Sequence, residues 1–238
     1  MLSLVFLAYA AVHLVVYVWG WRLWAANGRP TALFIVLFGA TLLWYDNFRI
    51  GVGRFIGPGD TLYRLSVPAF AWHWTLLPLL IIATGSLARL AGLQWARNRW
   101  VMACFCILAV ALSAMDTPKI FHLQLHTACL ADTVRYTTNV AASQLCPGDL
   151  VAHTEGPGGA LAAIITNFVA LGVGLALWAK RRWPWLAFGA GVMFVAAGGF
   201  ARSKWALPVA NFGEIFINTS FVITCAHFAR LRARARAP

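Results

Sequence analysis

Two acidic side chains stand in apolar surroundings where a carboxyl group could carry out acid–base chemistry. Asp46 follows an apolar run in "TLLWYDNFRIG", and Glu214 lies in the apolar stretch "NFGEIFIN". A carboxyl group in an apolar cavity keeps its proton to higher pH, because desolvation disfavours the charged form. It can then protonate an alkene, an epoxide or a leaving group. His73, between two tryptophans in "PAFAWHWTLLP", is the third catalytic candidate.

Polar and aromatic neighbours of these three residues are candidates for substrate binding. Some flank Asp46 or His73 in sequence, and others share a helix face with Glu214 at i−3 and i+4. One more lies at a similar depth in another apolar segment. The set is Tyr45, Asn47, Arg49, Trp72, Asn167, Asn211 and Asn218.

The three catalytic candidates also have structural interpretations. Asp46 can pair with Arg49 at i, i+3, which would make it an interfacial ion pair. His73 can be a hydrogen-bonded residue of an interfacial aromatic belt. Glu214 has no basic residue on its own helix face, so an ion pair explains it less well.

Metal and haem sites are the alternatives to a cofactor-free site. Carboxylate and imidazole groups are zinc ligands, and a set of Asp116, His122 and His126 would supply three of them. Haem would need a pair such as His13 and His73. Neither set belongs to a larger ligand motif, so we predict no cofactor, with zinc and haem kept as alternatives.

The composition shows what kind of element must position these residues. Hydrophobic residues make up 61% of the 238 residues and charged residues only 11%, whereas soluble domains contain about 25% charged residues. The net charge of +12 would suggest nucleic acid as a partner of a soluble protein. Here the arginines stand in short runs between apolar segments, which favours a role in membrane orientation and excludes nucleic-acid binding.

Seven apolar segments have about the 20 residues that a bilayer-spanning helix needs. We therefore predict an all-α, polytopic membrane protein that forms a single transmembrane domain over residues 1–238. The predicted transmembrane helices are 3–24, 31–49, 66–90, 99–116, 159–179, 183–201 and 207–228.

Basic residues predict the orientation of these helices. Twelve of the 19 Lys and Arg residues fall on the side of the C-terminus, so the positive-inside rule predicts an outer N-terminus and a cytoplasmic C-terminus. All seven acidic residues then fall in outer loops or outer helix halves. In a bacterium the protein would lie in the inner membrane, with its site on the periplasmic side.

The long segment 117–158, between the fourth and fifth helices, is predicted to be an outer extramembrane segment. Helical spacing over 117–146 places four polar residues on one face, and 146–159 has the glycines and prolines of a loop. We expect this outer helix to cover the mouth of a cavity, with a disulfide between Cys129 and Cys146 as a plausible tie. The four polar residues are Asp132, Arg135, Tyr136 and Asn139.

The stretches "LLWYDNFRIG", with Asp46, and "NFGEIFIN", with Glu214, give the chain a resemblance to the small seven-helix integral-membrane terpene cyclases of meroterpenoid pathways. The similarity covers length, helix number, orientation and one acid in each of the second and seventh helices. It implies that these acids start a cyclisation by protonating an epoxide or an alkene.

Together these patterns predict an integral membrane enzyme with an outward-facing polar cavity. It would act by acid–base chemistry on a lipid or isoprenoid, cyclisation included, with membrane lipids and a lipophilic small molecule as its partners; nothing in the sequence identifies a protein partner. We expect Asp46 and Glu214 to face the helix bundle and to share one cavity. The alternatives are a non-enzymatic binding, sensing or assembly component, and a metal-dependent lipid hydrolase that uses the outer histidines.

Overall fold

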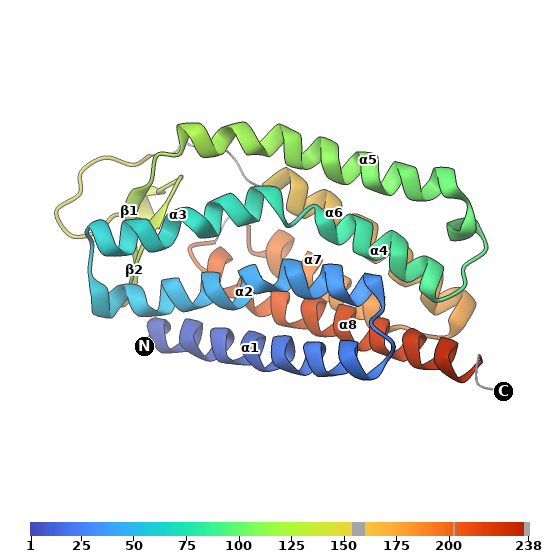
Figure 1. Cartoon of the computed structure of the whole chain (residues 1–238). Coiled ribbons are helices and arrows are strands. Elements are labelled where there is room, and N and C mark those ends of the chain that lie inside the picture. Colours follow the sequence, from blue (N-terminus) through green and yellow to red (C-terminus); the bar gives the residue numbers. More distant parts are fainter. Residues whose placement is uncertain (154–159, 202, 236–238) are drawn as a thin grey trace.

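A computed structural model describes residues 1–153, 160–201 and 203–235 of the chain. Long helices lie side by side along one direction, and a small two-stranded hairpin covers one end of the bundle (Figure 1). The helices are α1 (Leu2–Ala26), α2 (Thr31–Ile56), α3 (Asp60–Thr75), α4 (Leu79–Leu90), α5 (Arg99–Asp116), α6 (Ala160–Arg181), α7 (Trp185–Gly199) and α8 (Ala206–Arg234). Short 3₁₀ turns are η1 (Trp95–Arg97), η2 (Thr117–His122) and η3 (Ala142–Gln144), and the hairpin is β1 (His126–Leu130) with β2 (Thr133–Thr137).

Most of these helices are long and apolar enough to cross a membrane. Among the described residues, five qualify singly: α1, α2, α5 with its 3₁₀ extension, α6 and α8. A sixth span results if α3 and α4, which meet at a 46° bend, count as one. α7 is apolar but has only 15 residues. The prediction of an all-α protein with membrane-spanning helices is confirmed at this level.

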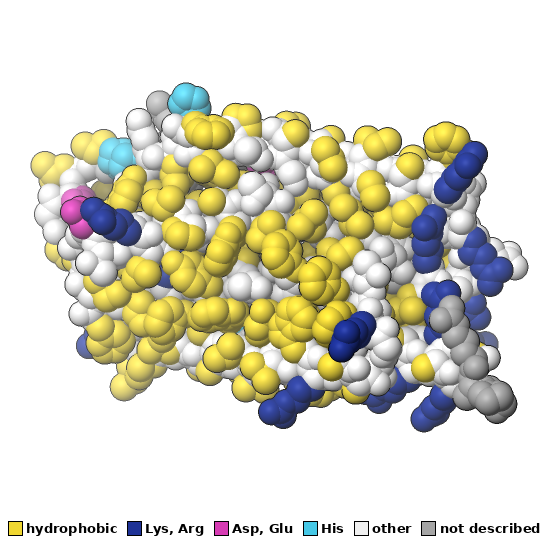
Figure 2. All heavy atoms as spheres, in the orientation of Figure 1, with side chains coloured by type: hydrophobic (Ala, Val, Ile, Leu, Met, Phe, Trp, Pro, Cys, Tyr) yellow, Lys and Arg dark blue, Asp and Glu magenta, His cyan; other side chains and the backbone are white. Residues whose placement is uncertain are grey.

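The two ends of the bundle carry different side chains. The N-terminus and the hairpin lie at one end, here called the hairpin end, and the C-terminus lies at the other, here called the basic end (Figure 1). Figure 2 shows hydrophobic side chains over the middle of the visible face and Lys and Arg side chains gathered at the basic end. Large apolar side chains such as Val15, Ile107, Val110 and Val195 are exposed on the helices, which suits contact with lipid.

Helix boundaries follow local sequence signals. Pro30, Pro78 and Pro184 stand directly before α2, α4 and α7, where the fixed φ of proline suits the start of a helix. Gly57, with φ of 76°, follows the last residue of α2. The left-handed conformation of this glycine ends the helix at low cost.

The bend between α3 and α4 leaves some backbone groups without a hydrogen-bond partner inside these two helices. A neighbouring helix supplies a partner for one of these groups. The hydroxyl of Ser113 on α5 donates a hydrogen bond of 3.0 Å to the carbonyl oxygen of Thr75. An unpaired carbonyl at membrane depth would cost several kcal/mol, roughly. The side chain of Ser113 therefore stabilises the bend that separates α3 from α4.

The hydrophobic core lies between α1, α2, α4, α6, α7 and α8. Leu33 and Leu37 of α2, Leu87 of α4, Leu177 of α6 and Phe221 of α8 are almost fully buried in one cluster. Each such side chain contributes about 1.5–3 kcal/mol through burial. This core holds the polar side chains described below at fixed positions.

The prediction of an outer helix over 117–146 is wrong, because this segment forms η2, the β1–β2 hairpin and η3. Thr, Val and Tyr residues favour a strand, and the turn between the strands has Ala131 at φ 52°. A strand alternates its side chains, so Arg135 is buried on one face while Tyr136 lies on the other. Asp132 sits in the turn, and Asn139 follows β2. The four residues therefore share no common face.

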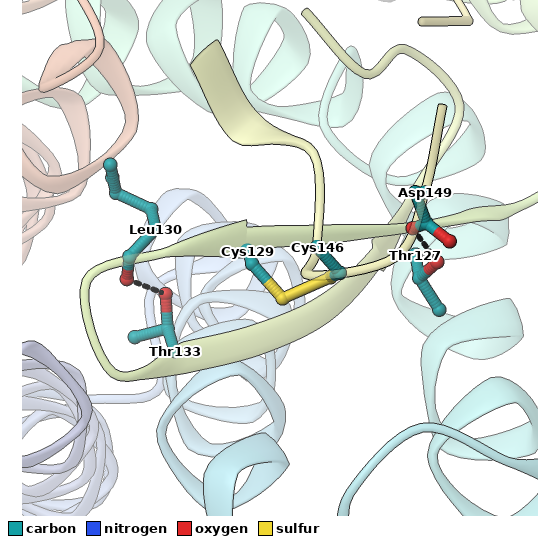
Figure 3. The surroundings of a disulfide bond; sticks show 6 residues. All are labelled: Thr127, Cys129, Leu130, Thr133, Cys146 and Asp149. Carbon is teal, nitrogen blue, oxygen red and sulfur yellow. Dashed lines mark hydrogen bonds between the residues drawn. A yellow bond between two sulfur atoms is a disulfide. The ribbon is translucent and has the colours of Figure 1, made fainter. Parts of the chain in front are cut away.

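The hairpin is tied down at several points. Cys129 of β1 is bonded to Cys146, and Thr127 donates a hydrogen bond to the carboxylate of Asp149 (Figure 3). The plausible disulfide between the two outer cysteines is thus present. At the turn, Asp132 pairs with Arg54 of α2 at 2.6 Å and with the amino group of Met1 at 2.7 Å. The two ion pairs hold the turn of the hairpin against α2 and against the start of α1.

Candidate functional site

A cavity of about 210 Å³ lies where β2 packs on α2 and α3, and we call it the polar cavity. Its ionisable side chains come from three separate elements of the chain. The ionisable residues are Asp46, Arg49, His73 and Arg135, and the adjoining hydroxyl groups belong to Thr137 and Thr138.

Asp46 and Arg49 form an ion pair in the wall of this cavity. Arg49 is 5% exposed, and its Nε and Nη2 lie 2.8 and 2.7 Å from the same carboxylate oxygen of Asp46. Its Nη1 donates to Ser66 and to the carbonyl oxygen of Tyr136, both at 3.3 Å. The guanidinium is also 5.2 Å from the ring of Phe70. Arg49 is thus fully engaged, and the structural interpretation of Asp46 as an ion-pair partner describes a contact that is present.

A second cavity, of about 80 Å³, lies deeper between α2, α4, α6 and α8, and we call it the apolar cavity. Leu43, Leu80, Ile217 and Phe221 are among its apolar walls. Glu214 lines it and, among the residues that the structure describes, has no hydrogen-bond or ion-pair partner. It is a carboxyl group surrounded largely by hydrocarbon.

His73 lines both cavities and therefore stands in the wall that they share. It comes from the last turn of α3, just before the bend that leads into α4. The expectation that Asp46 and Glu214 share one cavity is therefore corrected: they line two neighbouring cavities. Both His73 and Glu214 still lie within electrostatic range of Asp46. Equal depth in the membrane does not fix the direction in which a side chain points around its helix.

The candidate binding residues divide into packing contacts and cavity walls. Asn211 of α8 donates a 3.0 Å hydrogen bond to Asn47 of α2, and both are buried. Tyr45 donates to the carbonyl oxygen of Leu65 and contacts the ring of Trp72. These four candidates join helices and line neither cavity.

Asn167 and Asn218 do line the apolar cavity. Asn167 donates to the carbonyl oxygen of Ala190, but its own Oδ1 is buried and has no partner among the described residues. Asn218 bonds Nδ1 of the buried His13 at 3.3 Å. His13 does not line that cavity, so the structure does not place His13 and His73 on a common haem-sized space.

The alternative zinc ligands are not brought together. Asp116 pairs with Lys119, His122 ends η2, and His126 begins β1 and stacks on His153 with ring centroids 3.6 Å apart. No group of three or more His, Cys, Asp or Glu side chains in the described ranges is placed to hold a metal ion.

Arg135 is the site residue that the sequence placed elsewhere, on one face of the predicted outer helix. It is only 8% exposed, and its Nη2 donates a 2.9 Å hydrogen bond to Gln144. Burial, and then the nearby charge of Arg49, lower the pKa of its guanidinium to about 10, against the opposing effect of Asp46. It therefore stays charged at neutral pH. The β-branched residues and the tyrosine of "TVRYTT" favour a strand, and this was the signal that could have placed Arg135 on a buried strand face.

No protein-family model matches the chain, and neither curated proteins nor solved structures give a match to it.

Proposed function

We propose that this protein is an integral membrane enzyme that uses acid–base chemistry on a lipid or isoprenoid. The observation that carries the proposal is Glu214, a carboxyl group without a partner among the described residues that lines a narrow apolar cavity. A carboxyl group kept only for packing would be expected to have a hydrogen-bond or ion-pair partner, as Asp46 has in Arg49.

The proposed reaction begins with a proton. An uncharged Glu214 donates its proton to an alkene carbon or to an epoxide oxygen. The alkene becomes a carbocation; in the epoxide a C–O bond breaks, its electron pair stays on the oxygen as a hydroxyl group, and the positive charge is left on carbon. His73, in the wall of the same cavity, accepts the proton that the product loses. The net change is an isomerisation, and intramolecular attack on the cation by a second alkene makes it the cyclisation that the resemblance to terpene cyclases implies.

The proposal includes seven transmembrane helices with the hairpin end outside. α6 ends at the basic end and α8 begins at the hairpin end, so α7 serves as the seventh crossing (Figure 1). Its 15 residues would span about 22 Å at 1.5 Å per residue, and a bilayer can thin locally around a short helix. Basic residues favour a cytoplasmic basic end, and a disulfide at the hairpin end favours an oxidising compartment there.

The test compares three proteins purified into lipid nanodiscs: wild type, Glu214→Gln and Thr166→Val. Each is incubated with isoprenoids that carry a terminal epoxide or alkene, and products of unchanged mass are separated by chromatography. Glu214→Gln keeps the shape of the side chain but cannot donate the carboxylic proton, so turnover should fall by about 100-fold or more.

Thr166 is the matched control, because it lines the same cavity and its hydroxyl has no partner within the described structure. Thr166→Val should retain turnover. Equal turnover in wild type and Glu214→Gln would refute the proposed role of Glu214.

An assembly or binding component is the second candidate, and specific contacts favour it. The buried Asn47–Asn211 and His13–Asn218 contacts each join two helices, and the buried Arg49 joins α2 to Ser66 of α3 and to β2. Under this function, Glu214→Gln would change neither lipid composition nor turnover in any assay, and substitutions at the paired residues would act only through stability.

A further inference from the structure

The charges around the polar cavity do not balance. Two arginines and one aspartate line it, together with His73. Asp46 bonds Arg49 through two nitrogens and forms no ion pair with Arg135. Within the described part of the chain, Arg135 has a neutral partner, Gln144, and no carboxylate partner. One buried positive charge is therefore left uncompensated.

A buried charge of this kind is costly unless another group compensates for it. Breaking a buried ion pair, which leaves one charge alone, strongly destabilises proteins. The fold nevertheless places Arg135 here by several devices. It stands on the buried face of β2 opposite Ala128, which is fully buried and leaves room, and Gln144 holds its guanidinium. Such a built position is what binding of an anion requires.

Other donors of the cavity suit an oxygen-rich anion. Thr137 lies two residues after Arg135 on the same buried strand face and also lines the cavity. Arg135 uses one nitrogen for Gln144, which leaves most of the donors of its planar fork for a ligand. Planar forks of this kind match phosphate and carboxylate groups.

The size and neighbours of the cavity indicate the rest of the ligand. Its volume of about 210 Å³ is below the roughly 300–1,000 Å³ of sites for drug-sized ligands, which suits a head group. His73 borders both this cavity and the apolar one. An anionic group next to Arg135 thus has an apolar cavity beyond His73 for an attached hydrocarbon chain.

We infer that the polar cavity binds the oxyanion, phosphate or carboxylate, of an anionic amphiphile through Arg135 and Thr137, with its hydrocarbon chain directed past His73. The inference rests on the proposed function for what then happens to the chain, and it names the substrate class of that site. Arg49 adds to the positive electrostatic potential of the polar cavity, while its guanidinium remains paired with the carboxylate of Asp46.

Binding can be measured without knowing the natural substrate. Full-length protein in nanodiscs is titrated with dodecyl phosphate, with the neutral alcohol dodecanol and with inorganic phosphate, and both calorimetry and the melting temperature are recorded. Wild type should bind dodecyl phosphate at least about 10-fold more tightly than either of the other two, because only it supplies both the charge and the chain.

Arg135→Gln should weaken dodecyl phosphate binding by about 10-fold or more. Arg64→Gln is the matched control, since Arg64 is an exposed arginine of α3 outside the cavity and its loss changes the net charge equally. It should bind as wild type does. If Arg135→Gln does not fold, Thr137→Val takes its place, with an expected loss of about 3- to 10-fold.

Two results would overturn the inference: equal binding of dodecyl phosphate by wild type and the cavity variant, or equal binding of dodecyl phosphate and dodecanol by wild type. If wild type binds inorganic phosphate as tightly as dodecyl phosphate, the cavity is a site for free phosphate, and the claim that the ligand is an amphiphile is overturned. Glu214→Gln separates this inference from the proposed function. If Glu214→Gln retains turnover while dodecyl phosphate binding by the wild-type protein still depends on Arg135, only the proposed role of Glu214 is refuted.

Discussion

The polar and apolar cavities differ in what builds them. The apolar cavity is enclosed by helices, whereas the polar cavity needs residues from the hairpin as well as from α2 and α3. Their carboxyl groups differ accordingly: Asp46 is paired with Arg49, and Glu214 has no partner among the described residues. The two acids thus have different surroundings, and the roles that we propose for them differ: Asp46 holds a cation, and Glu214 donates a proton.

Among the changes that test this contrast, Asp46→Asn should have the largest effect, and we expect that effect on stability. The change leaves Arg49 buried without a carboxylate, and we expect the free energy of unfolding to fall by about 3 kcal/mol, the lower end of the range for a buried pair, because Asp46 is 24% exposed. Thermal unfolding in nanodiscs measures it.

Asp60→Asn is the control, since Asp60 is exposed at the start of α3. It should change stability by less than about 0.5 kcal/mol. If Asp46→Asn is as stable as the control while turnover is lost, Asp46 has the catalytic role and the contrast between the two acids is wrong.

The disulfide should stabilise the hairpin and, through it, the polar cavity. Replacing Cys129 and Cys146 together by serine removes a cross-link with a sequence separation of 17, which is worth about 3 kcal/mol in the chain-entropy model. Dodecyl phosphate binding should weaken as well, because Gln144, which holds Arg135, lies close to Cys146.

Cys104→Ser serves as control, because Cys104 is a free, exposed cysteine of α5. Unchanged dodecyl phosphate binding in the Cys129/Cys146 double variant would separate the polar cavity from the disulfide.

Docking of the hairpin on α2 can be disturbed at one glycine. A Cβ at Gly53 would overlap the carbonyl oxygen of Val134 in β2. Gly53→Ala must therefore move the hairpin, and we expect a loss of about 2 kcal/mol from this overpacking. Glu214-dependent turnover should be retained if the apolar cavity is built by helices alone.

Gly172→Ala in α6 is the paired control, since a Cβ there meets open space. It should be neutral or stabilising by up to about 1 kcal/mol. Equal melting temperatures for the two alanine variants would show that β2 does not press on Gly53.

The smallest expected effect is a pH dependence at the hairpin. Burial, and then the neighbouring His153, lower the pKa of His126 below its ordinary 6.5. The unfolded chain therefore binds the proton more readily, so this contribution to stability is full above about 6.5 and is lost as the pH falls through the lowered pKa. As the pH is lowered from about 6.5, the melting temperature of His126→Gln should fall less steeply than that of wild type. His122 is exposed, and the His122→Gln control should follow the wild-type curve.

Much of the fold could be predicted, because apolar length is a strong signal in membrane proteins. The segment predicted over 31–49 corresponds to α2, and that over 207–228 lies within α8. The hairpin could not be predicted in the same way. Polar residues at i, i+3, i+4 and i+7 suggested one helix face, yet the local preference of Thr and Val for strands prevailed.

The site was predictable in its residue types and only partly in its geometry. Asp46, His73 and Glu214 do lie in the walls of cavities. Their division between two cavities depends on the rotation of each helix about its axis, which packing decides. Arg135 was assigned to an outer helix face because the burial of one strand face appears only when the hairpin docks on α2.

The order of chain synthesis gives the ion pair of α2 a further consequence. Arg49 and Asp46 meet within a single helix, whereas Tyr136, whose carbonyl oxygen also accepts from Arg49, follows 87 residues later in the chain. A nascent chain therefore carries α2 into the membrane with its arginine already neutralised by the adjoining turn. The polar cavity is completed only after the hairpin has been synthesised and has returned to α2, so assembly of the helices and completion of the site are separate events in time.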